Sequence, residues 1–129
     1  MSKVFFFEDQ FDNIRGAIEW ANRKDFANAL IIESVLKTDE SFDFAKVANT
    51  FDVIFVDIQL ANRSYDDGIG VIKKLLAASS TVRNKIIVIS GHSEVNDLLS
   101  DAGFKDIPVL AKPIPKENLV FEIKRVLKL

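Results

Sequence analysis

The feature that most constrains this chain is a short apolar run, Phe-Asp-Val-Ile-Phe-Val-Asp, over residues 51–57. Branched and aromatic residues in so short a segment are typical of a strand buried on both faces, as in a parallel sheet. Asp57 ends this strand, at the place where open α/β sheets bind their ligands. Burial raises the cost of ionising a carboxylate, so we expect Asp57 to have compensating partners.

Three further apolar segments, residues 3–7, 86–89 and 109–111, also end in polar side chains. The residues that follow them are two acids, a hydroxyl and an amine: Glu8 and Asp9, Ser90, and Lys112. Together with Asp57 they form a set suited to chemistry on a phosphoryl group, where charge must be neutralised as it develops.

Strand-like and helix-like patterns alternate five times along the chain, with Ala29–Ile32 as the remaining strand. Apolar residues recur at helical spacing in five segments: Ile14 to Ala21, Phe44 to Phe51, Ile69 to Leu76, Val95 to Ala102 and Leu119 to Leu127. We expect Asp12 or Asn13 to cap the first helix, Gly103 to end the fourth, and Pro115 to open the last.

This alternation predicts an α/β fold, a doubly wound five-stranded parallel sheet with helices on both faces. The flavodoxin-like strand order 2-1-3-4-5 is the common one for five strands. It would bring Glu8, Asp9 and Asp57 together at the switch point of the sheet.

Composition narrows the function. The 17 basic and 19 acidic residues give a net charge of −2 and are spread out, which disfavours nucleic-acid binding. No segment has the length of a membrane span or the layout of a signal peptide. With no cysteine and one histidine, the expected metal is a hard ion held by oxygen, such as Mg²⁺. We expect a single intracellular domain spanning residues 1–129.

Over essentially its whole length the chain resembles the receiver domain of two-component response regulators. The resemblance rests on five motifs, each at the expected strand or helix end: Glu8-Asp9, Asp57, Asp67-Gly68, Ser90-Gly91 and Lys112-Pro113.

The resemblance implies that Asp57 is the nucleophile that accepts a phosphoryl group from a sensor histidine kinase or a histidine phosphotransfer protein. It implies that the domain catalyses its own aspartyl phosphorylation and dephosphorylation. Glu8, Asp9, Asp57 and the backbone carbonyl of Gln59 would hold Mg²⁺. Lys112 would pair with Asp57 before the transfer and with a phosphate oxygen after it. The bond from Lys112 to Pro113 is often cis in the family, which would help to aim the lysine.

In the same reading, Ser90 would hydrogen-bond a phosphate oxygen and Gly91 would leave room for the donor. The protein would be cytoplasmic, without an output domain after Leu129, and would signal through a downstream protein partner or a homodimer.

Two other functions stay open. A pseudo-receiver, an interaction module that is never phosphorylated, is favoured by three departures from the family: a longer stretch between Asp57 and Gly68, Ala61 in place of a proline, and Val109 in place of an aromatic residue. A small flavodoxin-like enzyme or nucleotide binder is disfavoured, because no glycine-rich loop follows the first strand.

Taken singly, the motifs also have plain readings. Glu8-Asp9 can cap a helix, Asp57 and Ser90-Gly91 can be turn residues, and Lys112 can be a surface lysine before a proline. His92 is given no catalytic role.

Overall fold

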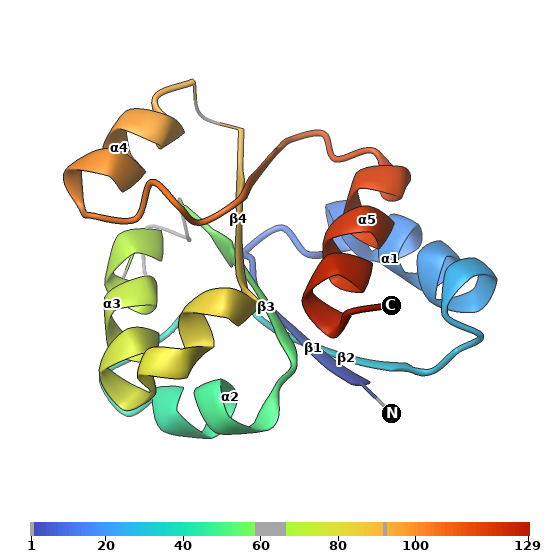
Figure 1. Cartoon of the computed structure of the whole chain (residues 1–129), viewed down its shortest axis with the longest axis horizontal. Helices are drawn as coiled ribbons and strands as arrows, with labels where there is room; N and C mark the ends of the chain where they lie inside the picture. The colour runs from blue at the N-terminus through green and yellow to red at the C-terminus, as the bar shows by residue number, and fades with distance from the viewer. Residues whose placement is uncertain (1, 59–66, 92) are drawn as a thin grey trace.

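A computed structural model describes residues 2–58, 67–91 and 93–129. Its centre is a parallel five-stranded sheet in the order β2-β1-β3-β4-β5 (Figure 1). The strands are β1 (Ser2–Phe7), β2 (Leu30–Val35), β3 (Val53–Asp57), β4 (Ile86–Ser90) and β5 (Val109–Ala111). The predicted fold class and strand order are therefore confirmed.

Helices cover both faces of the sheet. They are α1 (Asp12–Asp25), α2 (Phe44–Thr50), α3 (Gly68–Ala78), the 3₁₀ helix η1 (Ser80–Lys85), α4 (Val95–Asp101) and α5 (Lys116–Leu127). Helices α1 and α5 lie on one side, and α2, α3 and α4 lie on the other (Figure 1). None of the helices in the described part of the chain is long and apolar enough to cross a membrane.

The core consists of two apolar clusters separated by the sheet. Every residue of β3 is buried, as its sequence predicts, and the rings of Phe6 and Phe55 stack 4.6 Å apart on the side of α1 and α5. Phe5 and Phe7 pack on the other side, with the aromatic side chains of the α2 region. Each such side chain contributes roughly 1.5–3 kcal/mol through burial. This packing fixes β1 and β3 in place, and with them the positions of the residues that follow these two strands.

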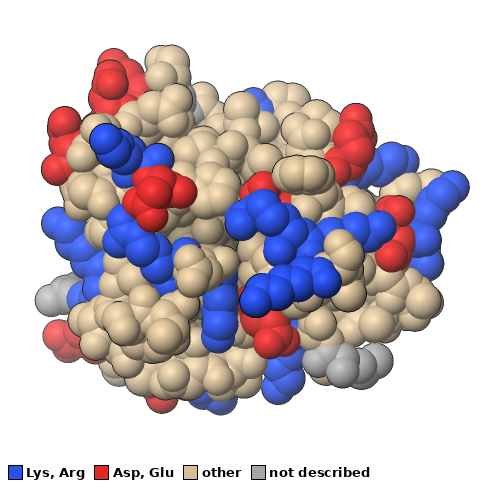
Figure 2. All heavy atoms as spheres, in the orientation of Figure 1, with Lys and Arg blue, Asp and Glu red and all other residues tan. Residues whose placement is uncertain are grey.

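Charged side chains of both signs are interspersed over the face seen in Figure 2, with several basic ones gathered beside α5. This mixture agrees with the near balance of charges in the sequence.

Some local expectations were wrong. Helix α1 begins after Phe11, with no side-chain cap from Asp12 or Asn13. Phe11 is buried against Phe6, with ring centroids 5.2 Å apart, and this packing sets the entry into the helix. Strand β2 runs on to Val35, because it pairs with all of β1. Leu98 fits the helical stripe of α4, but its side chain is 40% exposed.

Arg83, which the sequence analysis did not identify, holds the segment between Gly103 and β5 in place. Arg83 of η1 donates hydrogen bonds to the carboxylate of Asp106 and to the carbonyl of Gly103, and its guanidinium lies over the ring of Phe104. The Arg83 side chain lowers the pKa of Asp106 to about 2. These contacts anchor the chain that leads into β5, and therefore to Lys112.

Gly68 lies against the end of β3. The Asp67 carboxylate accepts a hydrogen bond from the amide of Gly70 at 2.8 Å, so Asp67 caps α3. The Gly68 amide donates to the carbonyl of Ile58 at 3.2 Å. A Cβ atom on Gly68 would lie 2.4 Å from the Asp57 carbonyl oxygen and 2.5 Å from the Ile58 Cα. Only glycine allows this approach.

Gly68→Ala should therefore push backbone against backbone at Asp57 and lower the free energy of unfolding by about 1–3 kcal/mol, measured by urea denaturation. Gly16→Ala is the matched control, because a Cβ atom on Gly16 meets nothing within 4 Å. That change should raise stability by about 0.5–1 kcal/mol, since Gly16 lies inside α1. Equal effects of the two changes would contradict the close contact.

Candidate functional site

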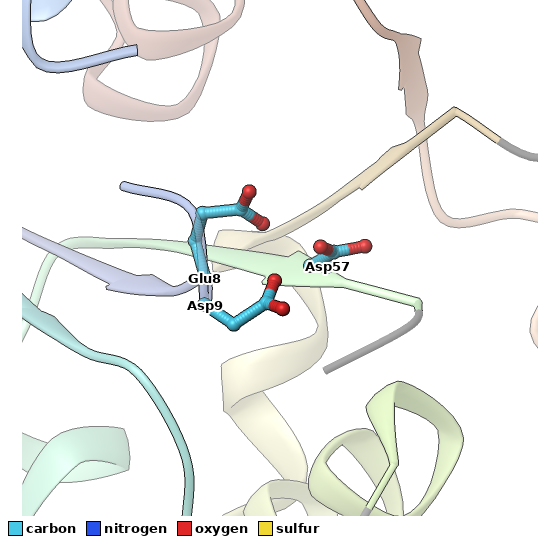
Figure 3. Close-up of side chains that lie close together, drawn as sticks. All are labelled: Glu8, Asp9 and Asp57. Carbon is cyan, nitrogen blue, oxygen red and sulfur yellow. The ribbon is translucent and has the colours of Figure 1, made fainter. Parts of the chain in front are cut away.

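Three carboxylates meet at the carboxyl ends of β1 and β3 (Figure 3). Glu8 directly follows β1 and Asp57 ends β3; the two strands are neighbours, with Phe7 opposite Val56. One oxygen atom from each of Glu8, Asp9 and Asp57 lies within 4.8 Å of the others. Glu8 and Asp57 are buried and Asp9 is half-buried, so the group opens to solvent on the Asp9 side.

Lys112 supplies a positive charge from the other end of the chain. Its Nζ atom donates to Glu8 Oε1 at 2.7 Å and to Asp57 Oδ2 at 2.9 Å. Its backbone amide donates to the Ser90 carbonyl at 2.9 Å, which continues the pairing of β5 with β4 past Ala111. The Lys112-Pro113 peptide bond is cis. One ammonium group thus links the strand ends that carry Glu8 and Asp57.

Ser90 ends β4, the strand next to β3, and is buried. The register places its neighbour Ile89 opposite Asp57 and places Ser90 itself opposite Ala111. A Cβ atom on Gly91 would lie 3.9 Å from the Cβ of Lys112, which is an ordinary contact. Ser90 therefore belongs to the same edge of the sheet as the three acids and Lys112.

The charges of this group do not balance, because three carboxylates face one ammonium group. Burial raises the pKa of Glu8 from 4.5 to about 8; the neighbouring Asp57 acts in the same direction, and Lys112 acts against it. Burial by itself lowers the pKa of Lys112, but its hydrogen bonds with Glu8 and Asp57 outweigh burial and the net shift is upward. Lys112 is thus held as a cation, whereas the surroundings of Glu8 favour its protonated form.

The site fits a hard divalent cation. Glu8 Oε2 is buried and has no hydrogen-bond partner in the described part of the chain, an arrangement that is costly unless an ion or a proton satisfies it. Its neighbours are carboxylate oxygens, the ligands that Mg²⁺ prefers. Gln59, whose carbonyl was expected to complete the set, lies outside the described residues, as does His92.

Sequence reasoning named the acids, Ser90 and Lys112, and the structure places them at one edge of the sheet. It did not anticipate that Lys112 contacts Glu8 as closely as it contacts Asp57. It also read Ile14 and Ala17 only as the inner stripe of a helix, although both line a cavity beside the site. The residue pattern held no signal for that second role, since alanine and isoleucine are ordinary core residues.

Comparisons with family models and with curated proteins found no match. Solved structures do match over nearly the whole chain. One is the receiver domain of a DNA-binding response regulator from Colwellia psychrerythraea, with a TM-score of 0.73, 16% identity and full coverage of both chains.

A CheY-like receiver domain from Methanospirillum hungatei has a TM-score of 0.72 and 20% identity, with 99% of this chain and 94% of that chain covered. This chain has the receiver-domain fold. A third match is the receiver domain of a sensor histidine kinase from Pseudomonas aeruginosa, solved with magnesium in its active-site cleft. Its TM-score is 0.70 and its identity 20%, with 99% of this chain and 98% of that chain covered.

The Glu8 pKa predicts how stability depends on pH in metal-free buffer. The unfolded chain releases the Glu8 proton near pH 4.5, whereas in the folded chain the pKa of Glu8 is raised to about 8. The free energy of unfolding should therefore fall as the pH rises through this window. Glu8→Gln should remove much of the decline and leave the variant more stable than wild type at pH 8, by roughly 1–3 kcal/mol.

Urea denaturation at pH 5 and pH 8 in the presence of EDTA measures the fall in the free energy of unfolding with pH. It also measures the difference in stability between Glu8→Gln and wild type at pH 8. Glu19→Gln, which alters an exposed glutamate of α1, is the matched control and should follow the wild-type curve. A Glu8→Gln protein with the wild-type pH dependence would show that Glu8 is not the titrating group.

Proposed function

We propose that this chain is a phosphoacceptor receiver domain in which Asp57 takes a phosphoryl group from a phosphohistidine donor. The observation that carries the proposal is the convergence of Glu8, Asp9 and Asp57 within 4.8 Å, with Lys112 bonded to two of them. The receiver fold supports it, since that fold places these residues at one edge of the sheet.

In the proposed reaction an oxygen of Asp57 bonds to phosphorus while the phosphorus–nitrogen bond to the donor imidazole breaks. Both the carboxylate and the phosphoryl group are anionic, so their approach needs positive charge nearby. Glu8, Asp9, Asp57 and the Gln59 carbonyl would hold Mg²⁺, which would supply part of that positive charge. Glu8 must give up its proton to serve as such a ligand.

Lys112 would supply a second positive charge to the anionic phosphoryl group. It begins bonded to Asp57 and Glu8, so its ammonium group is already positioned before a donor arrives. When Asp57 is phosphorylated, its charge moves outward onto the phosphate oxygens and Lys112 can follow it by a rotation of its side chain. The Ser90 hydroxyl would donate to another phosphate oxygen, a donor prepositioned by the end of β4.

The proposed function implies two kinds of partner. The phosphodonor would be a sensor histidine kinase or a histidine phosphotransfer protein, and the signal would pass to a downstream protein or to a second copy of this chain. The magnesium in the Pseudomonas aeruginosa receiver domain supports Mg²⁺ as the cofactor here.

A pseudo-receiver is the second candidate. Two departures from the family pattern favour it: the longer stretch between Asp57 and Gly68, and Val109 in β5 where an aromatic residue is usual. The two candidates make opposite statements about Asp57, so one labelling experiment separates them.

Intact-protein mass spectrometry after incubation with Mg²⁺ and phosphoramidate or acetyl phosphate should show a phosphoryl adduct. The adduct should be lost when EDTA replaces Mg²⁺ and should be absent from Asp57→Asn. Asp52→Asn, which alters a half-buried acid just before β3, is the matched control and should label like wild type. An unlabelled wild-type protein would favour the pseudo-receiver, and a labelled Asp57→Asn protein would remove Asp57 as the acceptor.

Lys112→Met should slow labelling by about a hundredfold or more, because it removes a prepositioned positive charge from the transition state. Mg²⁺ binding, followed by calorimetry, should persist because the three carboxylates remain. Lys116→Met alters an exposed lysine four residues along the chain and serves as control. Wild-type labelling rates in Lys112→Met would contradict the assigned role.

A further inference from the structure

Lys112 follows the shortest strand of the sheet. β5 has three residues, lies at the edge of the sheet and pairs with β4. None of its three residues is buried, whereas every residue of β3 and of β4 is. So short a strand gains little from burial, and contacts outside it must therefore help to fix its position along β4.

The carboxyl end of β5 is held by Lys112 itself. The ammonium group bonds to Glu8 and Asp57, and the backbone amide donates to the Ser90 carbonyl. In the proposed reaction the ammonium group moves from the Asp57 carboxylate toward the phosphate oxygens. Its bonds therefore change during the transfer, and contacts at the other end of β5 must keep the strand in place.

The amino end of β5 is held by Arg83. This residue lies in the last turn of η1, which runs directly into β4, the strand that pairs with β5. Its Nε atom donates to Asp106 Oδ2 at 2.8 Å, and its Nη2 atom donates to Asp106 Oδ1. The Nη2 atom also donates to the Gly103 carbonyl at 2.8 Å, and the guanidinium lies over the buried ring of Phe104. A bidentate pair of this kind fixes orientation as well as distance.

Packed residues connect these contacts to β5. Ile107 is buried, and its amide donates to the Phe104 carbonyl at 3.0 Å. The Pro108 carbonyl accepts a hydrogen bond from the amide of Val88 in β4 at 2.8 Å. A displacement of Asp106 would therefore be passed along the chain into β5.

We propose that Arg83 is a positioning residue for phosphoryl transfer, which fixes the start of β5 against β4 and so holds Lys112 in line with the phosphoryl group that Asp57 accepts. This inference rests on the proposed function of Asp57. The contacts of Arg83 described above lie at the opposite end of β5 from Lys112, so Arg83 acts through the strand and not on the phosphoryl group. Alignment of a charge-neutralising group raises the rate of transfer.

The first test is the initial rate at which phosphoramidate and Mg²⁺ label the protein. Arg83→Ala should slow labelling about tenfold, because a small misplacement of the ammonium group weakens its contact with the transition state. Mg²⁺ binding, followed by calorimetry, should be unchanged, since the three carboxylates lie on β1 and β3 and in the residues after β1. Arg15→Ala is the matched control and should label like wild type. Arg15 also pairs with an aspartate, Asp12, and lies over a phenylalanine ring, Phe11, but these partners are its neighbours in sequence.

A double-mutant cycle distinguishes positioning from a general loss of stability. If Arg83 acts through Lys112, Arg83→Ala should change the labelling rate of the Lys112→Met protein by less than about twofold. A general loss of stability would slow labelling by the same factor in both backgrounds. Asp106→Asn gives the same cycle with a milder change, because the Asp106 side chain is 60% exposed and keeps its size. It should slow labelling severalfold when Lys112 is present and leave the Lys112→Met rate unchanged.

The outcomes separate the two proposals. If the wild-type protein is not labelled, the receiver function fails and this inference fails with it. If the wild-type protein is labelled but Arg83→Ala and Asp106→Asn keep its rate, the receiver function stands and the positioning role is wrong. Equal slowing with and without Lys112 would also overturn the positioning role.

Discussion

The interaction on which the site depends is the pair of hydrogen bonds from Lys112 to Glu8 and Asp57. It gathers two buried carboxylates that would otherwise repel each other, and it joins the last strand of the sheet to the two central ones. Three acids still face one ammonium group, so a deficit of positive charge remains. A proton on Glu8 can make up that deficit, and in the proposed function a bound divalent cation would do so. Stability and the proposed metal binding would therefore depend on the same residues.

Close packing around β3 fixes the position of the strand end that carries Asp57. β3 is buried along its whole length, and α3 approaches so closely that only hydrogen is tolerated at the Cα of Gly68. On the other side of the site, the amide of Lys112 is tied to Ser90, and Arg83 fastens the segment that leads into β5. The cavity beside α1 adjoins this edge of the sheet, because Glu8 and Lys112 also line it.

The sequence by itself determined the fold class and the residues at the strand ends, because hydrophobic periodicity reports burial and parallel strands end at a common edge. The strand order was predicted only as the common one for five strands, since periodicity does not encode which strands are neighbours. Tertiary structure alone decided the rest. Lys112 reaches Glu8 across 104 positions of sequence, a contact that no local pattern encodes. Packing of Phe11 against Phe6 overrode the capping preference of Asp12 and Asn13, since burying a ring outweighs one cap. Ala17 looked like core and lines a cavity, because only the placement of α5 against α1 shows which core positions are left uncovered.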